Sequence, residues 1–138
     1  MKRGKRDIKS NRRAKEWIKQ AEYDYSVAET LFENRHYIYT IFMCHLCVEK
    51  GLKGLYCERL REVPPKTHDL IYLLKKMGLK PPEETIIFVG ELSEKSIITR
   101  YPEDFSRIKN SFSEERAKNI LLKTGGALEW IKNMLSKR

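Results

Sequence analysis

The sequence predicts an all-α protein, a five-helix antiparallel up-and-down bundle. Apolar residues recur at spacings of three and four along most of the chain, which is the period of a helix face. Strict alternation of polar and apolar residues, the pattern of a half-buried strand, does not extend over a useful length. Most connections between the expected helices are short, which favours antiparallel neighbours, and 138 residues fit one such domain.

The first expected helix covers residues 11–33. Its apolar stripe runs from Ala14 to Phe32 at spacings of three and four, with charged residues on the other faces. Ser10 or Asn11 can cap its start, because both side chains accept hydrogen bonds from the free amides of a first turn.

A basic segment precedes this helix. Residues 1–20 hold nine Lys or Arg and two acids, a balance of +7, so residues 21–138 contribute only +2 of the net charge of +9. We therefore expect a basic arm at residues 1–12, ordered or disordered, before a helical domain at residues 13–138. Such an arm can bind nucleic-acid phosphates, steer an acidic partner or simply keep the chain soluble.

The second expected helix covers residues 36–60 and is the most apolar part of the chain. Residues from Ile38 to Val48 are apolar on nearly every side, which is typical of a helix surrounded by other helices. A buried strand is the alternative, but a stretch of this length without a turn signal is too long for a strand. Gly51 and Gly54 each cost about 1 kcal/mol relative to Ala inside a helix, which indicates that another helix passes close by.

The third expected helix is short and follows a Pro-Pro turn. Pro64 and Pro65 cannot continue the second helix, because their rings remove an amide donor and clash with the preceding turn. Thr67 is a suitable N-cap, the buried stripe begins at Leu70, and Gly78 is a suitable terminator.

The fourth expected helix opens at Pro82, with acidic residues in its first turn. We expect Ile86, Val89 and Leu92 to face inward. The helix ends near Thr99, because a proline three residues later disfavours helical geometry at the residue before it.

The last expected helix follows an irregular linker at residues 100–111. Ser111 or Ser113 caps its start. Gly125 and Gly126 in its middle mark either a tight contact with a neighbouring helix or a kink. Its expected inner face consists of Ala117, Ile120, Leu121, Thr124, Leu128, Ile131 and Leu135.

Cysteine usage and hydropathy exclude several classes of protein. Three cysteines do not suggest a disulfide framework, and although Cys44 and Cys47 have the spacing of metal ligands, no second pair accompanies them. We expect buried structural thiols, no metal and no cofactor. The longest apolar run is too short to span a bilayer and no secretory signal is present, so we expect no membrane association and a cytoplasmic location.

Charged residues interrupt the apolar second helix at Glu49-Lys50-x-x-Lys53. They indicate either an intrahelical pair between Glu49 and Lys53 or a cationic patch beside a groove, aimed at phosphates. His45 lies one turn before Glu49, which favours a hydrogen-bonded histidine in the core or at an interface. His68 opens the third helix directly after the Pro-Pro turn.

Four blocks of the sequence form a recognisable series. The blocks are Ala21-Glu22-Tyr23-Asp24-Tyr25 with Ala28 and Leu31, then Tyr37 with Cys47-Val48-Glu49-Lys50-Gly51-Leu52-Lys53, then Pro64-Pro65-Lys66-Thr67-His68-Asp69-Leu70 with Leu73, and finally Thr99-Arg100-Tyr101-Pro102. In this order they resemble the HEPN domain, the helical "higher eukaryotes and prokaryotes nucleotide-binding" domain. The resemblance covers about residues 15–105, and the last helix fits the same bundle.

The resemblance implies a helical bundle that often forms homodimers. It also implies pairing with a minimal nucleotidyltransferase encoded beside it, commonly as a toxin–antitoxin system. Many members of the wider superfamily are metal-independent ribonucleases with an Arg-x4-6-His motif, in which acid–base chemistry directs the ribose 2′-hydroxyl at its own phosphate.

This chain departs from the ribonuclease motif. With four residues between them, the histidine position after Arg100 is occupied by Phe105, and no histidine follows Arg100 anywhere in the chain. Arg61 and His68 satisfy the spacing by count, but they lie on either side of the Pro-Pro turn. The alternative of a ribonuclease toxin would therefore use a non-standard set, His68 with Arg61 or Arg100.

We accordingly expect a non-catalytic module that binds a nucleotide or an RNA phosphate, rather than an enzyme. The expected ligand-binding residues are Lys50, Lys53, Arg100, Tyr101 and His68. Lysine and arginine would contact phosphate, and Tyr101 would stack on a base or shape the groove. Arg100 is also open to a structural role as an ion pair in the linker, and a pure protein-interaction domain is a third reading of the whole chain.

Overall fold

The computed structural model describes residues 2–98, 106, 107, 109, 110 and 112–135. These residues form five named helices, α1 (Lys2–Glu33), α2 (Tyr37–Leu60), α3 (Leu70–Met77), α4 (Glu83–Ile98) and α6 (Glu114–Leu135). The described part of the chain contains no strand, which confirms the all-α class with five helices. None of the described helices combines the length and the hydropathy needed to cross a bilayer.

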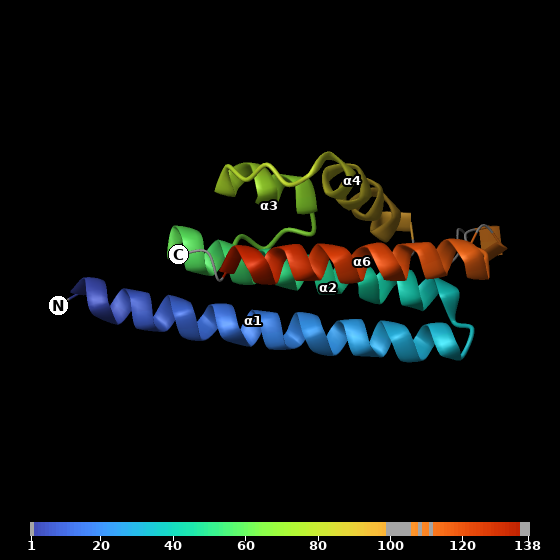
Figure 1. The fold of residues 1–138 in the computed structure, drawn as a ribbon, viewed down its shortest axis with the longest axis horizontal. Helices are drawn as coiled ribbons and strands as arrows, with labels where there is room; N and C mark the ends of the chain where they lie inside the picture. Colours follow the sequence, from blue (N-terminus) through green and yellow to red (C-terminus); the bar gives the residue numbers. More distant parts are fainter. Residues whose placement is uncertain (1, 99–105, 108, 111, 136–138) are drawn as a thin grey trace.

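The three long helices α1, α2 and α6 lie side by side, and α3 and α4 form a shorter second layer over α2 and α6 (Figure 1). Helix α2 runs antiparallel to α1. Helix α6 runs in the same direction as α2 and antiparallel to α1, because the chain returns through α3 and α4 before α6 begins (Figure 1). Contacts agree with this direction, since Tyr25 meets Leu121 while Glu22, nearer the start of α1, meets Lys132.

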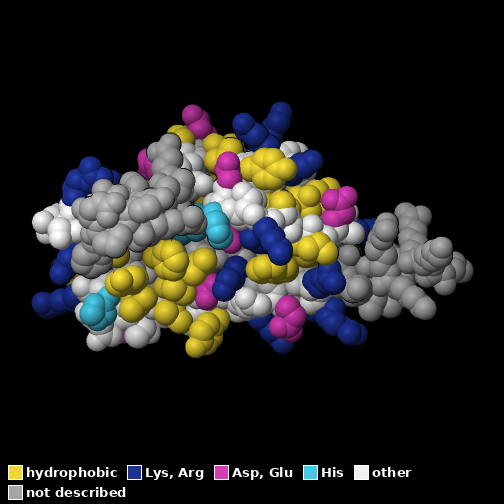
Figure 2. Space-filling model, turned by 180° about the vertical axis from the view of Figure 1, so that it is seen from behind, with side chains coloured by type: hydrophobic (Ala, Val, Ile, Leu, Met, Phe, Trp, Pro, Cys, Tyr) yellow, Lys and Arg dark blue, Asp and Glu magenta, His cyan; other side chains and the backbone are white. Residues whose placement is uncertain are grey.

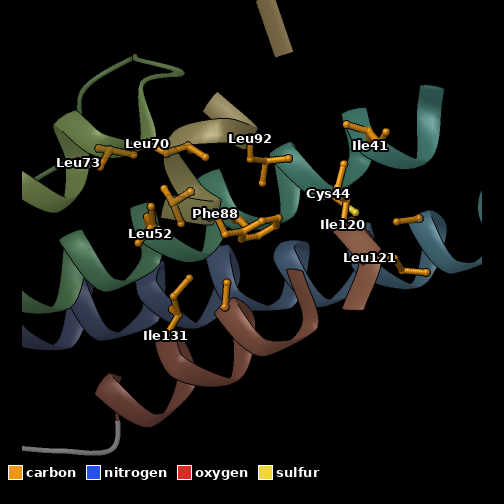
Figure 3. Packing of buried hydrophobic residues seen from close by; sticks show 14 of the residues in the cluster. Ile41, Cys44, Leu52, Leu70, Leu73, Phe88, Leu92, Ile120, Leu121 and Ile131 are labelled. Carbon is orange, nitrogen blue, oxygen red and sulfur yellow. The ribbon is translucent and has the colours of Figure 1, made fainter. Parts of the chain in front are cut away.

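Helix α2 is the central helix, as its uniform hydropathy predicted. Each of the other four named helices packs against it. Fifteen of its 24 residues are buried, so hardly any face is left to solvent. Apolar side chains from the surrounding helices, among them Leu70, Leu92 and Ile131, pack with α2 residues such as Leu52 in one core (Figure 3).

Close helix packing explains the glycines of α2, as expected. A methyl group on Gly54 would lie 3.1 Å from the backbone oxygen of Ala14 and 3.1 Å from Cβ of Trp17, so α1 passes directly over this position. A methyl group on Gly51 would lie 3.0 Å from Cδ1 of Ile131 on α6. Small residues at these two levels let both neighbouring helices approach α2.

The Gly125-Gly126 pair marks a tight contact. A methyl group on Gly125 would lie 2.7 Å from the hydroxyl of Tyr25, which donates a hydrogen bond of 3.2 Å to the backbone oxygen of Leu121. Helix α6 runs without interruption through this pair. Of the two readings, the close approach of α1 accounts for Gly125.

Two helix starts differ from the expectation. Helix α1 begins at Lys2, so residues 2–12 continue it as helix, and the functional division at residue 12 stays a prediction. Asp69, not Thr67, caps α3: its carboxylate accepts the Tyr72 backbone amide at 3.0 Å, while the Thr67 hydroxyl accepts the Asp69 amide at 3.1 Å. Gly78 ends α3 with a φ of 65°, as expected.

The inner face of α4 was partly mispredicted. Val89 and Leu92 are buried, but Ile86 is 40% exposed and Phe88 takes the inward place. Residues at 88, 89 and 92 share one face of a helix. At 3.6 residues per turn, position 86 lies about 160° around the helix from position 88, so its side chain turns outward. The larger ring of Phe88 fills the space between α4 and α2 (Figure 3).

Candidate functional site

A line of polar residues crosses the apolar central helix. His45, Glu49 and Lys53 follow at intervals of four, so they share one face of α2. All three are buried, with 3%, 5% and 7% of their surface exposed. We call these three residues the polar face of α2.

The lysine and the carboxylate of the polar face form an ion pair. Lys53 Nζ donates to Glu49 Oε2 at 3.0 Å, and the same ammonium lies 5.8 Å from the centre of the Trp17 ring on α1. A cation at this distance from an indole is attracted by the electrons of the ring face. The intrahelical pair that the Glu49-Lys53 spacing suggested is therefore present, and it is enclosed between α1 and α2.

The second oxygen of Glu49 binds His68, which comes from the loop between α2 and α3. His68 Nδ1 lies 2.8 Å from Glu49 Oε1, and because a carboxylate only accepts, Nδ1 carries the proton and donates it. His45 Nε2 lies 3.1 Å from the backbone oxygen of His68 and donates to it. His45 Nδ1, 3.8 Å from Glu49 Oε1, is too distant for a hydrogen bond.

His68 is the exposed end of this buried cluster. Its side chain is 58% exposed, whereas the side chain of Glu49 behind it is 6% exposed. Since Nδ1 is held by Glu49, the remaining ring nitrogen, Nε2, is the one available to a ligand. The cap at Asp69 fixes the backbone immediately after His68 at the start of α3.

Stability alone does not account for the cluster. Burying a carboxylate and an ammonium costs several kcal/mol of hydration per ion, and well-packed apolar residues in place of such a pair are often neutral or stabilising. Each of the other named helices contributes apolar residues to the core around α2, and Glu49 and Lys53 interrupt that core. The arrangement instead places one oriented imidazole at the surface.

Lys50 turns away from this cluster. Its Nζ lies 2.9 Å from Asp24 Oδ2 on α1, with the two side chains 23% and 8% exposed. Among the described residues that buried oxygen receives no hydrogen bond of suitable direction, so charge attraction holds the contact with Lys50. Lys50 and Lys53 thus neutralise different carboxylates, and of the two interpretations of this segment the structure shows the intrahelical pair between Glu49 and Lys53.

The remaining predicted site residues fall elsewhere. Arg61 is exposed and ends α2 in the left-handed region, with φ 55°, its amide donating to the Cys57 oxygen at 3.0 Å. Arg100, Tyr101 and Phe105 lie outside the described residues, so their expected roles stay predictions. Of the predicted set, the structure brings together Lys53 and His68.

The thiols are buried, as expected. Burial raises the pKa of Cys44 to about 11, and a hydrogen bond with Thr124 lowers it by a smaller amount. Burial also raises the pKa values of Cys47 and Cys57. Such thiols stay protonated near neutral pH, which makes them poor nucleophiles and poor metal ligands. Within the described ranges, no group of three or more His, Cys, Asp or Glu side chains is placed to hold a metal.

Comparisons with known proteins agree with this fold. The HEPN domain family matches residues 14–134. MJ1304 of Methanocaldococcus jannaschii, which carries the name of a candidate toxin, is 29% identical over 142 residues that cover 91% of this chain and 90% of that protein.

Two crystal structures share the fold at 22% identity. TT1696 from Thermus thermophilus aligns with a TM-score of 0.76 over 88% of this chain and 98% of the other. ST0689, an archaeal HEPN homologue, aligns with a TM-score of 0.71 over 89% of this chain and 98% of its own. At this level of identity the likeness concerns the arrangement of the helices.

Proposed function

This chain belongs to the HEPN domain family, and from that premise we propose that it is a toxin-like module that binds a nucleotide or an RNA phosphate without cleaving it. The observation that carries the proposal is the exposed His68 ring held by a buried carboxylate. The toxin-like role is supported by the name of the relative MJ1304. The basic charge of +9 suits an anionic ligand.

The proposed ligand contacts follow from the geometry. Nε2 of His68, which has no hydrogen-bond partner among the described residues, leads the set, with Arg100 and Tyr101 proposed beside it. Lys50 and Lys53 would contribute directly only by leaving Asp24 and Glu49, so we propose that in the free protein they chiefly supply positive charge behind the site.

The proposed partners follow from the family. A minimal nucleotidyltransferase would act as the antitoxin, and two copies of this chain would form a homodimer in the cytoplasm. Sizing chromatography of the chain alone tests the dimer, and co-purification with the protein encoded beside it tests the pairing. A monomer at micromolar concentration contradicts the first proposal, and a neighbouring gene product unrelated to nucleotidyltransferases contradicts the second.

RNA binding is tested by fluorescence anisotropy with a short labelled single-stranded RNA over a range of salt concentrations. We expect binding at low salt that weakens steeply as salt rises, because phosphate contacts release counterions. No binding even at low salt would contradict the proposal and favour a domain that contacts only proteins.

A metal-independent ribonuclease is the second candidate, and one observation favours it. A carboxylate behind the Nδ1–H of a histidine is the arrangement that orients a general acid–base imidazole. Incubating the protein with RNA in EDTA distinguishes the candidates. Cleavage that survives EDTA and disappears in His68→Asn would establish the ribonuclease, whereas intact RNA supports the binding module.

A further inference from the structure

We infer that Glu49 is a positioning residue for His68, and that it makes Nε2 the ring nitrogen that donates to a phosphate oxygen of the bound nucleotide or RNA. The identity of the ligand rests on the proposed function. The positioning itself stands on the contacts of His68 alone.

Two anchors fix the histidine. The ring is held at Nδ1 by Glu49, at 2.8 Å, and the backbone oxygen of the same residue accepts from His45 at 3.1 Å. Both anchors come from the buried face of α2, the most enclosed helix of the bundle. A histidine held at ring and backbone keeps one orientation, although its side chain is 58% exposed.

The charges of the cluster suit a cationic imidazole. Glu49 and Lys53 together are neutral, with the ammonium on Oε2 and the ring on Oε1. With Nδ1–H donated to Glu49, a hydrogen at Nε2 on the opposite side of the ring makes the ring an imidazolium, whose charge faces the carboxylate 2.8 Å away. Nε2–H then donates a charge-assisted hydrogen bond to phosphate, which a neutral ring with a bare Nε2 cannot do.

The variant that tests the positioning removes the whole buried pair. Glu49→Gln alone would leave Lys53 as an unpaired buried cation and could unfold the chain. Glu49→Leu with Lys53→Met instead replaces both charges with apolar side chains of similar size. The control makes the same changes at a more accessible pair 3.9 Å apart on α6, Glu129→Leu with Lys132→Met, which also removes the contact of Lys132 with Glu22.

The variant that tests the ligand contact is His68→Asn. The amide of Asn can still donate toward Glu49, but the side chain has no atom at the place of Nε2. The same change at the exposed His36, in the turn between α1 and α2, is its control. Far-UV circular dichroism confirms the fold of each variant.

The experiment combines nitrogen-15 NMR of the histidine rings with anisotropy of a short labelled single-stranded RNA. We expect the neutral His68 ring of the wild type to hold its proton on Nδ1, and to lose this preference in Glu49→Leu with Lys53→Met. We expect both that variant and His68→Asn to bind RNA at least about tenfold more weakly, since a hydrogen bond to a charged group is worth that factor or more. The two controls should bind as the wild type does.

The outcomes separate the inference from the proposed function. A His68 ring protonated on Nε2 alone, or one unaffected by loss of the Glu49 carboxylate, overturns the positioning. RNA affinity unchanged in His68→Asn overturns the phosphate contact. A wild-type ring protonated on Nδ1 in a protein that binds no RNA at low salt overturns the proposed function and leaves the positioning established.

Discussion

The buried residues of α2 differ in chemical character. Cys44 and Cys47 are enclosed and protonated, so they act as small apolar side chains. Glu49 and Lys53 are equally enclosed but keep their charges paired. The polar face of α2 therefore acts at the surface through one group, the oriented ring of His68.

Cys44 makes the stability of the folded chain fall at alkaline pH. Burial raises the pKa of this thiol from 9.0 to about 11, opposed by the hydrogen bond with Thr124. Because the thiol ionises more readily in the unfolded chain, its contribution to stability is complete below pH 9 and is lost as pH rises toward 11, by about 2–3 kcal/mol. Urea unfolding at pH 8 and at pH 10.5 measures this loss.

The control for this prediction is Cys44→Ala. Other groups, such as the half-buried Tyr25 and the buried Cys47, also have raised pKa values and add to the same trend, so the difference between the two proteins is the quantity to compare. We expect the variant to lose less stability than the wild type between the two pH values. Equal losses would show that Cys44 does not titrate as its burial implies.

The sequence predicted some of the site and missed the rest for a physical reason. The spacing of Glu49 and Lys53 is local, so their pairing could be predicted from helix geometry. The contact between Glu49 and His68 spans 19 residues and depends on how the loop after α2 folds back. The partner of Lys50, Asp24, lies on another helix, and no local pattern distinguishes it from the other acids of α1.

Glycine residues determine how closely the long helices pack against one another. Gly51 and Gly54 bring α6 and α1 close to α2, and Gly125 receives the Tyr25 hydroxyl. The sequence indicated the contacts at Gly51 and Gly54, because glycine is unfavourable inside a helix without such a reason, but it left a kink open at Gly125. For α4 it placed Val89 and Leu92 correctly but took Ile86 instead of Phe88, because apolar residues lie on several sides of that helix and only packing selects among them.

Gly125 and Gly126 make a matched pair for testing this packing. Among the described residues nothing lies within 4 Å of a methyl group placed on Gly126, so Gly126→Ala should stabilise the protein by about 0.5–1 kcal/mol through helix propensity. Gly125→Ala meets the Tyr25 hydroxyl at 2.7 Å and should destabilise the protein. Urea unfolding of both variants measures the difference.

Tyr25→Phe serves as the partner change. It removes the hydroxyl that a methyl group on Gly125 would meet, so Gly125→Ala should be less harmful in that background. Equal effects of Gly125→Ala and Gly126→Ala on the free energy of unfolding would contradict the close contact with α1.

Charge is the property of the whole molecule that bears on its ligand. The net charge of +9 resides mostly in residues 1–20. On the face shown in Figure 2, Lys and Arg side chains are spread out and interspersed with acidic ones, instead of gathering into one patch. The affinity for a polyanion is therefore expected to depend more on the cations in the first part of α1 than on those scattered over the bundle.

The basic segment is tested by replacing Lys5, Arg6, Lys9 and Arg12 with glutamine. The logarithm of the RNA affinity should then fall less steeply with the logarithm of the salt concentration, by a slope difference of up to about 3, since each neutralised phosphate of a single strand contributes about 0.7. Anisotropy titrations at several salt concentrations measure the slope.

The control removes the same number of cations from the bundle, at the exposed Lys75, Lys76, Lys80 and Lys118. We expect a slope closer to that of the wild type. If the two sets of changes reduce the slope equally, the first turns of α1 have no special part in binding.

The most direct test of the account is an NMR titration of the wild-type protein with single-stranded RNA, following the ring signals of His68 and His36. The account predicts that the ring signals of His68 shift progressively until they saturate, with Nε2 gaining a proton. The ring signals of the exposed His36 should not change. Saturable shifts elsewhere in the protein with an unchanged His68 ring would contradict it.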